Sequence, residues 1–157
     1  MSIKNSNLDK LNPKLYCLHY RECDPKKCTS IKLDKFNLLR IIPRISGRLN
    51  KAVILNPFSE EEISKNDRDI ILQYGLIVID CSWKKLLNFK RFDRGIGRKL
   101  PALIAANPIN YGKWEKLSSA EALAAALIIA GFEEYAQEIL AKFSWGGEFL
   151  KLNNLKK

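Results

Sequence analysis

The stretch AVILNPFSEEEISKNDRDIILQYGLIVIDCSW (residues 52–83) decides the fold, because it contains a strand, a helix and a second strand in succession. Residues 52–55 are apolar and stop at an Asn-Pro pair, which predicts a short strand. Ser64 and Asp67 then have the spacing of a capping box, and the helix that they begin ends at a glycine. Residues 76–80 predict a buried second strand. A strand–helix–strand unit of this kind indicates a parallel sheet and hence an α/β protein.

The rest of the chain predicts further elements around this unit and no linker between domains. We expect residues 1–13 to be disordered or frayed and residues 14–157 to form a single α/β domain. An Ala-rich helix is predicted to begin at Ser118, with Glu121 at the capping-box position. The other expected elements are a strand at 14–20, a helix at 31–36 capped by Thr29 or Ser30, a short helix at 84–89, a strand at 102–106, and helices at 132–143 and 148–154.

The formal net charge of +10 is distributed unevenly along the chain. Residues 1–51 contain twelve Lys and Arg against four Asp and Glu, and residues 83–116 contain nine against two, whereas residues 52–82 are acidic. Two basic regions favour a polyanion such as RNA as partner, although Lys-rich surfaces also serve solubility. The loop at 90–99 combines Arg with two glycines, which suits contact with phosphate. The residues expected to contact RNA are Lys26, Lys27, Arg91, Arg94, Arg98 and Lys99.

No segment predicts a membrane span or a secretion signal. The most apolar segment, residues 120–130, is shorter than the roughly 20 residues that a bilayer requires, and the N-terminus lacks the apolar core of a signal peptide. We therefore expect a cytoplasmic protein with no membrane partner, in which the cysteines are reduced thiols. Cys17, His19, Cys23 and Cys28 do not have the short spacing of structural zinc ligands, so no metal is expected.

The polar cluster IDCSW (residues 79–83) closes the second strand of the deciding unit and is the first candidate for a ligand site. Ligands of parallel sheets bind outside the carboxyl ends of the strands, and three polar segments are expected to follow strands there. Simpler explanations exist, because Asp80 can cap a helix that starts at Ser82, Trp83 can belong to the core, and the third segment can be a tight turn. The three segments are residues 21–30, 80–85 and 107–112.

The sequence argues against three common classes of enzyme. It contains neither the GxGxxG fingerprint of dinucleotide-binding folds nor the GxxxxGK[ST] loop of P-loop NTPases. A Ser-His-Asp hydrolase is disfavoured because the single histidine, His19, lies inside a predicted strand rather than after one.

Five longer motifs resemble the small-subunit rRNA aminocarboxypropyltransferases of ribosome biogenesis, and the similarity extends over residues 15–153. The resemblance implies an archaeal member with a SPOUT-like parallel sheet, helices on both faces and a C-terminal trefoil knot. It implies that S-adenosylmethionine donates its 3-amino-3-carboxypropyl group to N3 of a pseudouridine or N1-methylpseudouridine in the helix 31 loop of small-subunit rRNA. Methylthioadenosine would be released, and the enzyme would be a monomer. The motifs are CDPKKCTS (23–30), GLIVIDCSW (75–83), GIGRKLPALIAANPINYGK (95–113), LSSAEALAAAL (117–127) and AKFSWGGEFLKLN (141–153).

The resemblance also implies roles for individual residues. Asp80 matches a position expected to accept or orient the N3 proton of the acceptor base, as a carboxylate can. Trp83 matches a position expected to pack against the sulfonium methyl, helped by cation–π attraction, so that the methylene chain faces the base. The cofactor-binding positions that it implies are Thr29, Ile77, Trp83, Leu100, Tyr111, Trp114, Glu115 and Ser119.

Two alternative functions remain at this point. A SPOUT-type RNA methyltransferase would keep the fold but release S-adenosylhomocysteine in place of methylthioadenosine. A non-catalytic rRNA-binding assembly factor would use the basic charge alone, and substitution of Asp80 would leave its function intact.

Overall fold

The computed structural model of the protein describes residues 12–19, 28–80, 95–113 and 117–155. Within these ranges the side chains of His19 and Asp80 are not described. None of the helices in these ranges is long and apolar enough to cross a membrane.

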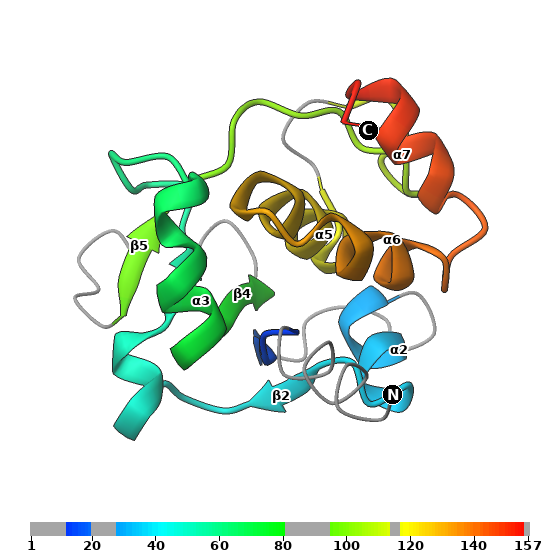
Figure 1. Ribbon diagram of the computed structural model, residues 1–157. Helices are drawn as coiled ribbons and strands as arrows, with labels where there is room; N and C mark the ends of the chain where they lie inside the picture. Colours follow the sequence, from blue (N-terminus) through cyan, green and yellow to red (C-terminus); the bar gives the residue numbers. More distant parts are fainter. Residues whose placement is uncertain (1–11, 20–27, 81–94, 114–116, 156–157) are drawn as a thin grey trace, which may run out of the picture.

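A five-stranded sheet with the order β2-β1-β4-β3-β5 organises the described part of the chain, and all neighbouring strands are parallel (Figure 1). The strand–helix–strand unit predicted from residues 52–83 is confirmed, because β3 and β4 are adjacent and parallel. The first strand lies in the interior of the sheet, between β2 and β4. The strands are β1 (Leu15–His19), β2 (Arg40–Ile42), β3 (Val53–Leu55), β4 (Leu76–Asp80) and β5 (Ile96–Arg98).

Apolar side chains cover both faces of the central strands, as expected for a parallel sheet. Residues such as Cys17 and Val78 face a large core to which α2, α3, α5, α6 and α7 all contribute buried side chains. Residues such as Leu18 and Ile77 face a smaller cluster, which includes Leu49 of the 3-10 helix η1. The helices are α2 (Thr29–Lys35), η1 (Gly47–Lys51), η2 (Lys65–Asp67), α3 (Arg68–Tyr74), α5 (Ser119–Ala130), α6 (Glu133–Leu140) and α7 (Gly146–Leu152).

Helix α5 is the centre of the large core and lies beside α6 (Figure 1). Eight of its residues are buried, five of them alanines, so neighbouring elements approach its backbone closely. The predicted cap is confirmed: Ser118 and Glu121 form a capping box. Gly131 ends the helix with a left-handed φ of 101°, which glycine adopts without steric cost.

The helix predicted before β4 is also confirmed at both ends. Ser64 and Asp67 form a capping box around η2, and α3 continues from it. Gly75 ends α3 with a φ of 106°. A Cβ at Gly75 would lie 2.7 Å from the ring of Tyr16, so glycine also allows β1 and β4 to start side by side.

The strand predicted at 102–106 is wrong. The fifth strand is instead formed by Ile96–Arg98, in the segment for which the sequence predicted a basic loop. Gly97 allows this pairing, because a Cβ there would lie 2.4 Å from Ser59 Oγ. The apolar character of residues 102–106 reflects burial without a strand, since Leu103 and Ala106 are buried in the large core.

The predicted cap of the helix after β1 is wrong as well. Helix α2 begins at Thr29, and Cys28 is its cap residue without a side-chain cap bond. Ser30 is buried, and its Oγ lies 2.9 Å from Cys28 Sγ. The Thr29 hydroxyl bonds to a different helix, as described below.

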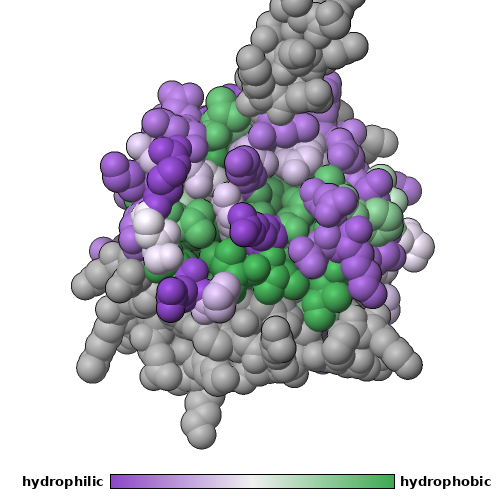
Figure 2. Space-filling view, turned by 90° about the horizontal axis from the view of Figure 1, so that it is seen from below, coloured by the Kyte–Doolittle hydropathy of each residue, from purple (hydrophilic) through white to green (hydrophobic). Residues whose placement is uncertain are grey.

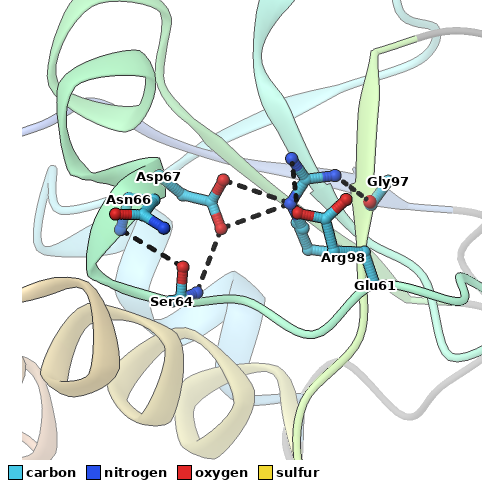
Figure 3. A network of polar contacts seen from close by, with 6 residues as sticks. All are labelled: Glu61, Ser64, Asn66, Asp67, Gly97 and Arg98. Carbon is cyan, nitrogen blue, oxygen red and sulfur yellow. Dashed lines mark hydrogen bonds and ion pairs between the residues drawn. The ribbon is translucent and has the colours of Figure 1, made fainter.

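Arg98 connects the edge strand β5 to the start of α3 (Figure 3). Its Nε donates to Asp67 Oδ1 at 3.1 Å, and its guanidinium also lies 3.4 Å from Glu61 Oε2. The Asp67 side chain is only 4% exposed and also accepts a hydrogen bond from the Ser64 N–H at 3.0 Å. One buried carboxylate therefore holds both the helix cap and the edge strand.

Substitution Asp67→Asn is expected to lower the free energy of unfolding by about 3 kcal/mol, because the largely buried Arg98 would lose its buried carboxylate partner and keep only the exposed Glu61. Asparagine keeps an acceptor oxygen for the cap, so the change isolates the ion pair. Glu61 is the matched control: its side chain is 69% exposed, and Glu61→Gln should cost less than about 1 kcal/mol. Urea unfolding of both variants measures the difference, and equal effects would contradict the assignment.

Candidate functional site

The carboxyl ends of β1 and β4 form a topological switch point. These strands are adjacent, but the chain passes from β1 to β2 on one side and from β4 to β5, beyond β3, on the other. The chain therefore continues to opposite sides of this strand pair, and parallel sheets bind ligands outside the carboxyl ends of the strands at such a point. His19 and Asp80 pair in register, so the Asp80 backbone lies at this end of the sheet.

Helix α5 begins beside the connection that follows β1. Thr29, the first residue of α2, accepts a hydrogen bond from the Ala120 N–H through its Oγ1 at 3.0 Å. An N–H in the first turn of a helix has no partner within the helix, so Thr29 acts as a second cap supplied from another part of the chain. The hydroxyl can still donate its own proton to a ligand. This contact fixes the N-terminus of α5 next to the candidate site.

Glu121 organises the other side of the α5 N-terminus. Its side chain is fully buried, and its two carboxylate oxygens accept from the N–H groups of Ala106, Asn107 and Ser118 and from Asn107 Nδ2, at 2.6 to 3.1 Å. A buried carboxylate is tolerated when N–H donors replace its water shell, and the N-terminus of a helix favours its charge. Glu121 therefore anchors the segment at 104–107 to α5.

The segment at 104–107 obtains its backbone partners from side chains and from the chain just after it, since Ala105 donates to the Lys113 carbonyl at 2.9 Å and accepts from the Gly112 N–H at 2.7 Å. Asn153, at the end of α7, accepts from the Ile104 N–H at 2.6 Å and donates to the Ile104 carbonyl at 2.8 Å. Asn107 Oδ1 accepts from the Asn110 N–H at 3.0 Å and closes the turn that follows. The turn predicted at residues 107–112 is confirmed, although no strand precedes this turn.

The predicted cofactor positions in the described ranges fall in different surroundings. Thr29 and Ser119 are partly exposed and lie together at the start of α5, through the bond from Thr29 to Ala120. Leu100 is partly exposed in the segment after β5 and packs against the large core. Ile77 is fully buried in mid-strand, paired between β1 and β3. Contact of these residues with a cofactor stays a prediction.

The Tyr111 side chain contacts α7. Its hydroxyl donates to Glu148 Oε2 at 3.0 Å, and the residue is 55% exposed. The hydrogen bond to the Glu148 carboxylate raises the pKa of the Tyr111 phenol above its usual value. The predicted approach of Tyr111 to an adenine ring stays a prediction.

Two RNA-contact candidates can be placed. Arg98 has its guanidinium on Asp67 and Glu61, so much of its charge is neutralised within the protein. Lys99 is partly exposed, and its backbone pairs with the segment at 61–63. The other RNA-contact candidates, Lys26, Lys27, Arg91 and Arg94, lie outside the described residues. The same holds for the cofactor candidates Trp83, Trp114 and Glu115 and for the side chain of Asp80.

Sequence reasoning missed the residues that build the site. Glu121 was predicted only as a cap, and Asn107 only as a strand terminator. A signal for Glu121 was present, because it is the only charged residue in an otherwise apolar helix. No sequence signal indicated that Asn153 would bond to a segment 49 residues away.

Known proteins match the sequence of this chain over most of their length. A family model described as ribosome biogenesis protein, C-terminal, matches residues 53–156. The 16S rRNA aminocarboxypropyltransferase of Methanosphaera stadtmanae is 46% identical over 144 residues, covering 89% of this chain and 83% of that protein. The enzyme of the same name from Methanothermobacter thermautotrophicus is 44% identical, covering 89% and 84%.

The chain belongs to the 16S rRNA aminocarboxypropyltransferase family. A solved structure in the same family, that of the SAM-dependent rRNA:acp-transferase Tsr3 from Vulcanisaeta distributa, has a TM-score of 0.84 and 39% identity. The match covers 90% of this chain and 79% of that one. The resemblance seen in the sequence motifs is thereby confirmed.

A second family model, described as a possible Fer4-like domain in RNase L inhibitor, matches residues 13–44. Cys17 and Cys28 lie in this range and are both buried. Among the side chains that the structure describes, no group of three or more His, Cys, Asp or Glu is placed to hold a metal ion. Cys23 lies outside the described residues.

Substitution Glu121→Gln is expected to lower the free energy of unfolding by about 3 kcal/mol, because an amide NH₂ would face backbone N–H donors in a buried site. Glu134→Gln, on the exposed side of the first turn of α6, is the control and should change stability by less than about 0.5 kcal/mol. Chemical unfolding followed by circular dichroism measures both. A Glu121→Gln variant as stable as the control would show that the carboxylate does not anchor the segment.

Proposed function

We propose that this protein transfers the 3-amino-3-carboxypropyl group of S-adenosylmethionine to N3 of a pseudouridine or N1-methylpseudouridine in small-subunit rRNA. Identity of 44–46% to enzymes named 16S rRNA aminocarboxypropyltransferase, over most of both chains, carries the proposal. The switch point at the carboxyl ends of β1 and β4, where the Asp80 backbone lies, supports it as a place for the reaction.

The described residues near the switch point fit S-adenosylmethionine. The donor has an adenosine and an amino acid, which need hydroxyl and backbone partners beside apolar walls. Thr29 and Ser119 offer hydroxyls at the start of α5. Leu100, which is partly exposed after β5, matches a family position that contacts the cofactor largely through its backbone. These three residues would hold the donor together with Trp83.

The chain's own residues would act on the proton and on orientation. When bound, S-adenosylmethionine supplies a sulfonium whose bond to the carboxypropyl carbon breaks as the uracil nitrogen forms its new bond. Asp80 would accept or orient the N3 proton of the base. Trp83 would hold the methyl group away from the acceptor, so that the carboxypropyl carbon faces it.

The proposal extends to the finer features implied by the resemblance. Residues 14–157 would form one SPOUT-like domain, with the segments after β5 threaded as a C-terminal trefoil knot. The enzyme would act as a monomer in the cytoplasm on the pre-ribosomal small subunit. The parallel sheet and the high similarity to the Vulcanisaeta distributa structure support this arrangement.

Incubation of the protein with carboxypropyl-labelled S-adenosylmethionine and small-subunit RNA tests the reaction. Mass analysis of the nucleosides should show a labelled uridine derivative, and methylthioadenosine should accumulate in equal amount. Release of S-adenosylhomocysteine would instead indicate a methyltransferase. Absence of both products, with RNA binding retained, would indicate an assembly factor.

Thr29 is expected to contribute to donor binding through its hydroxyl. Thr29→Val removes both the cap on Ala120 and the proton available to a ligand, so affinity for S-adenosylmethionine should fall by about tenfold, the equivalent of one hydrogen bond. Thr29→Ser keeps the hydroxyl and should restore most of the affinity. Calorimetric titration of the donor measures both variants, and equal affinities would contradict the assignment.

Asp80 and Trp83 are expected to affect different steps. Asp80→Asn should lower the rate of transfer by about 100-fold or more, the usual contribution of a general base, while donor affinity stays within about twofold. Trp83→Ala should weaken donor binding, because packing and cation–π attraction to the sulfonium are lost. Single-turnover rates and equilibrium titrations separate the two effects. Full activity of Asp80→Asn would remove Asp80 from the reaction.

A further inference from the structure

A groove of about 800 Å³ lies beside β2, away from the strand pair β3 and β5. It is lined by residues where β1 and β4 begin, by β2 and the segment after it, by η1 and by the end of α3. Figure 2 shows apolar side chains in the middle of one face of the molecule, with hydrophilic ones among and beside them. The charged and aromatic residues that line the groove are Lys14, Tyr16, Arg40, Arg44, Arg48 and Tyr74.

We propose that this groove is a second RNA-docking surface, which binds rRNA strands flanking the target loop. The inference rests on the proposed function for the identity of the RNA. The groove lies outside the candidate site for the reaction. Its residues would be RNA contacts in addition to those predicted from the sequence at 26–27 and 91–99.

The charge of the groove favours a polyanion. Its lining contains one lysine and three arginines and no acidic residue. Lys14, Arg40, Arg44 and Arg48 are all exposed. Within the described ranges neither Arg40 nor Arg44 forms an ion pair, unlike Arg98. Cations in such a setting neutralise phosphates and release counterions, which makes binding strongly salt-dependent.

The shape and chemistry of the groove favour single-stranded RNA over a duplex. Tyr16 and Leu49 present partly exposed apolar surface between the cations, and single-stranded nucleic acids bind to grooves that combine cations with aromatic rings. Arg48 combines a cation with an aromatic ring, because its guanidinium lies 4.9 Å from the centre of the Tyr74 ring. The same guanidinium donates a hydrogen bond to the Gln73 carbonyl. Arg48 is thus held in place at the rim.

The position of the groove separates it from the chemistry. Gly75 lines the groove, and Asp80 lies at the other end of β4, about 16 Å away at the rise of ~3.3 Å per residue of a strand. A nucleotide at the candidate site and a strand in the groove would therefore belong to different parts of one RNA. The chain's own residues 1–11 do not match the groove in charge, since they carry two lysines and one aspartate.

The test compares two triple variants with the same change of net charge. The groove variant is Lys14→Gln, Arg40→Gln, Arg44→Gln, which spares Arg48 because of its contacts with Tyr74 and Gln73. The control variant is Lys35→Gln, Lys65→Gln, Lys151→Gln, at exposed positions outside the groove. Two RNAs are titrated over a range of salt concentrations: the helix 31 hairpin alone, and the same hairpin with its flanking strands.

The groove variant should bind the flanked RNA at least tenfold more weakly than the wild type. The slope of log K against log salt concentration should be smaller in magnitude by about two to three, since each lost phosphate contact lowers this slope by about one. Its affinity for the hairpin alone, its donor affinity and its thermal midpoint should match those of the control variant.

Three outcomes would overturn the inference. Equal losses in both variants would mean that only long-range charge is involved. Equal losses on both RNAs would remove the assignment to flanking strands, and no loss would remove the groove from RNA binding. Each is distinguishable from failure of the proposed function, because release of methylthioadenosine by the wild type is measured independently of these titrations.

Discussion

The buried carboxylate of Glu121 is the interaction on which the candidate site depends. It binds four N–H groups, two from the segment before the turn at 107–112, one from an amide side chain and one from its own helix cap. An ionised group without water is stable only when such donors surround it. Glu121 therefore joins the N-terminus of α5 to the turn, and Thr29 joins the same N-terminus to the start of α2.

The protein uses its basic residues in two ways. Arg98 is paired with two carboxylates and adds a side-chain tie to β5, an edge strand that also forms a backbone ladder with β3. Arg40 and Arg44 lie in a groove whose described lining contains no acidic residue, and we propose that their charge serves a partner. Net charge alone does not distinguish these roles, because the distinction lies in which carboxylates the fold brings close.

The sequence predicted the parts of the fold that depend on local patterns. Ser64 with Asp67 and Ser118 with Glu121 are capping boxes within four residues, and the apolar run at 76–80 is a strand by its own composition. Residues 102–106 were misassigned because a buried irregular segment has the same composition as a strand. Its side-chain hydrogen-bond partners, Glu121 and Asn153, are distant in sequence, so no local pattern could reveal them.

The sequence predicted at which edge of the sheet the candidate site lies, but it did not predict the side-chain contacts that build the site. Parallel strands locate the site after β1 and β4, and the family motifs name Asp80 and Trp83. The cap that Thr29 provides joins residues 91 positions apart, and the arginines of the groove are spread over β2 and the segment after it. These juxtapositions arise from the strand order, which composition and spacing do not encode.

The interior position of β1 has a consequence for synthesis. Leu15 pairs with Leu76, so β1 and β2 emerge from the ribosome before their neighbour β4 exists. At ~5–20 residues per second, the apolar edge of β1 waits for roughly 3–12 s, a period in which nascent chains can associate through open strands. Residues 1–51 carry twelve basic against four acidic side chains, and mutual repulsion between such segments would keep neighbouring nascent chains apart until the sheet closes.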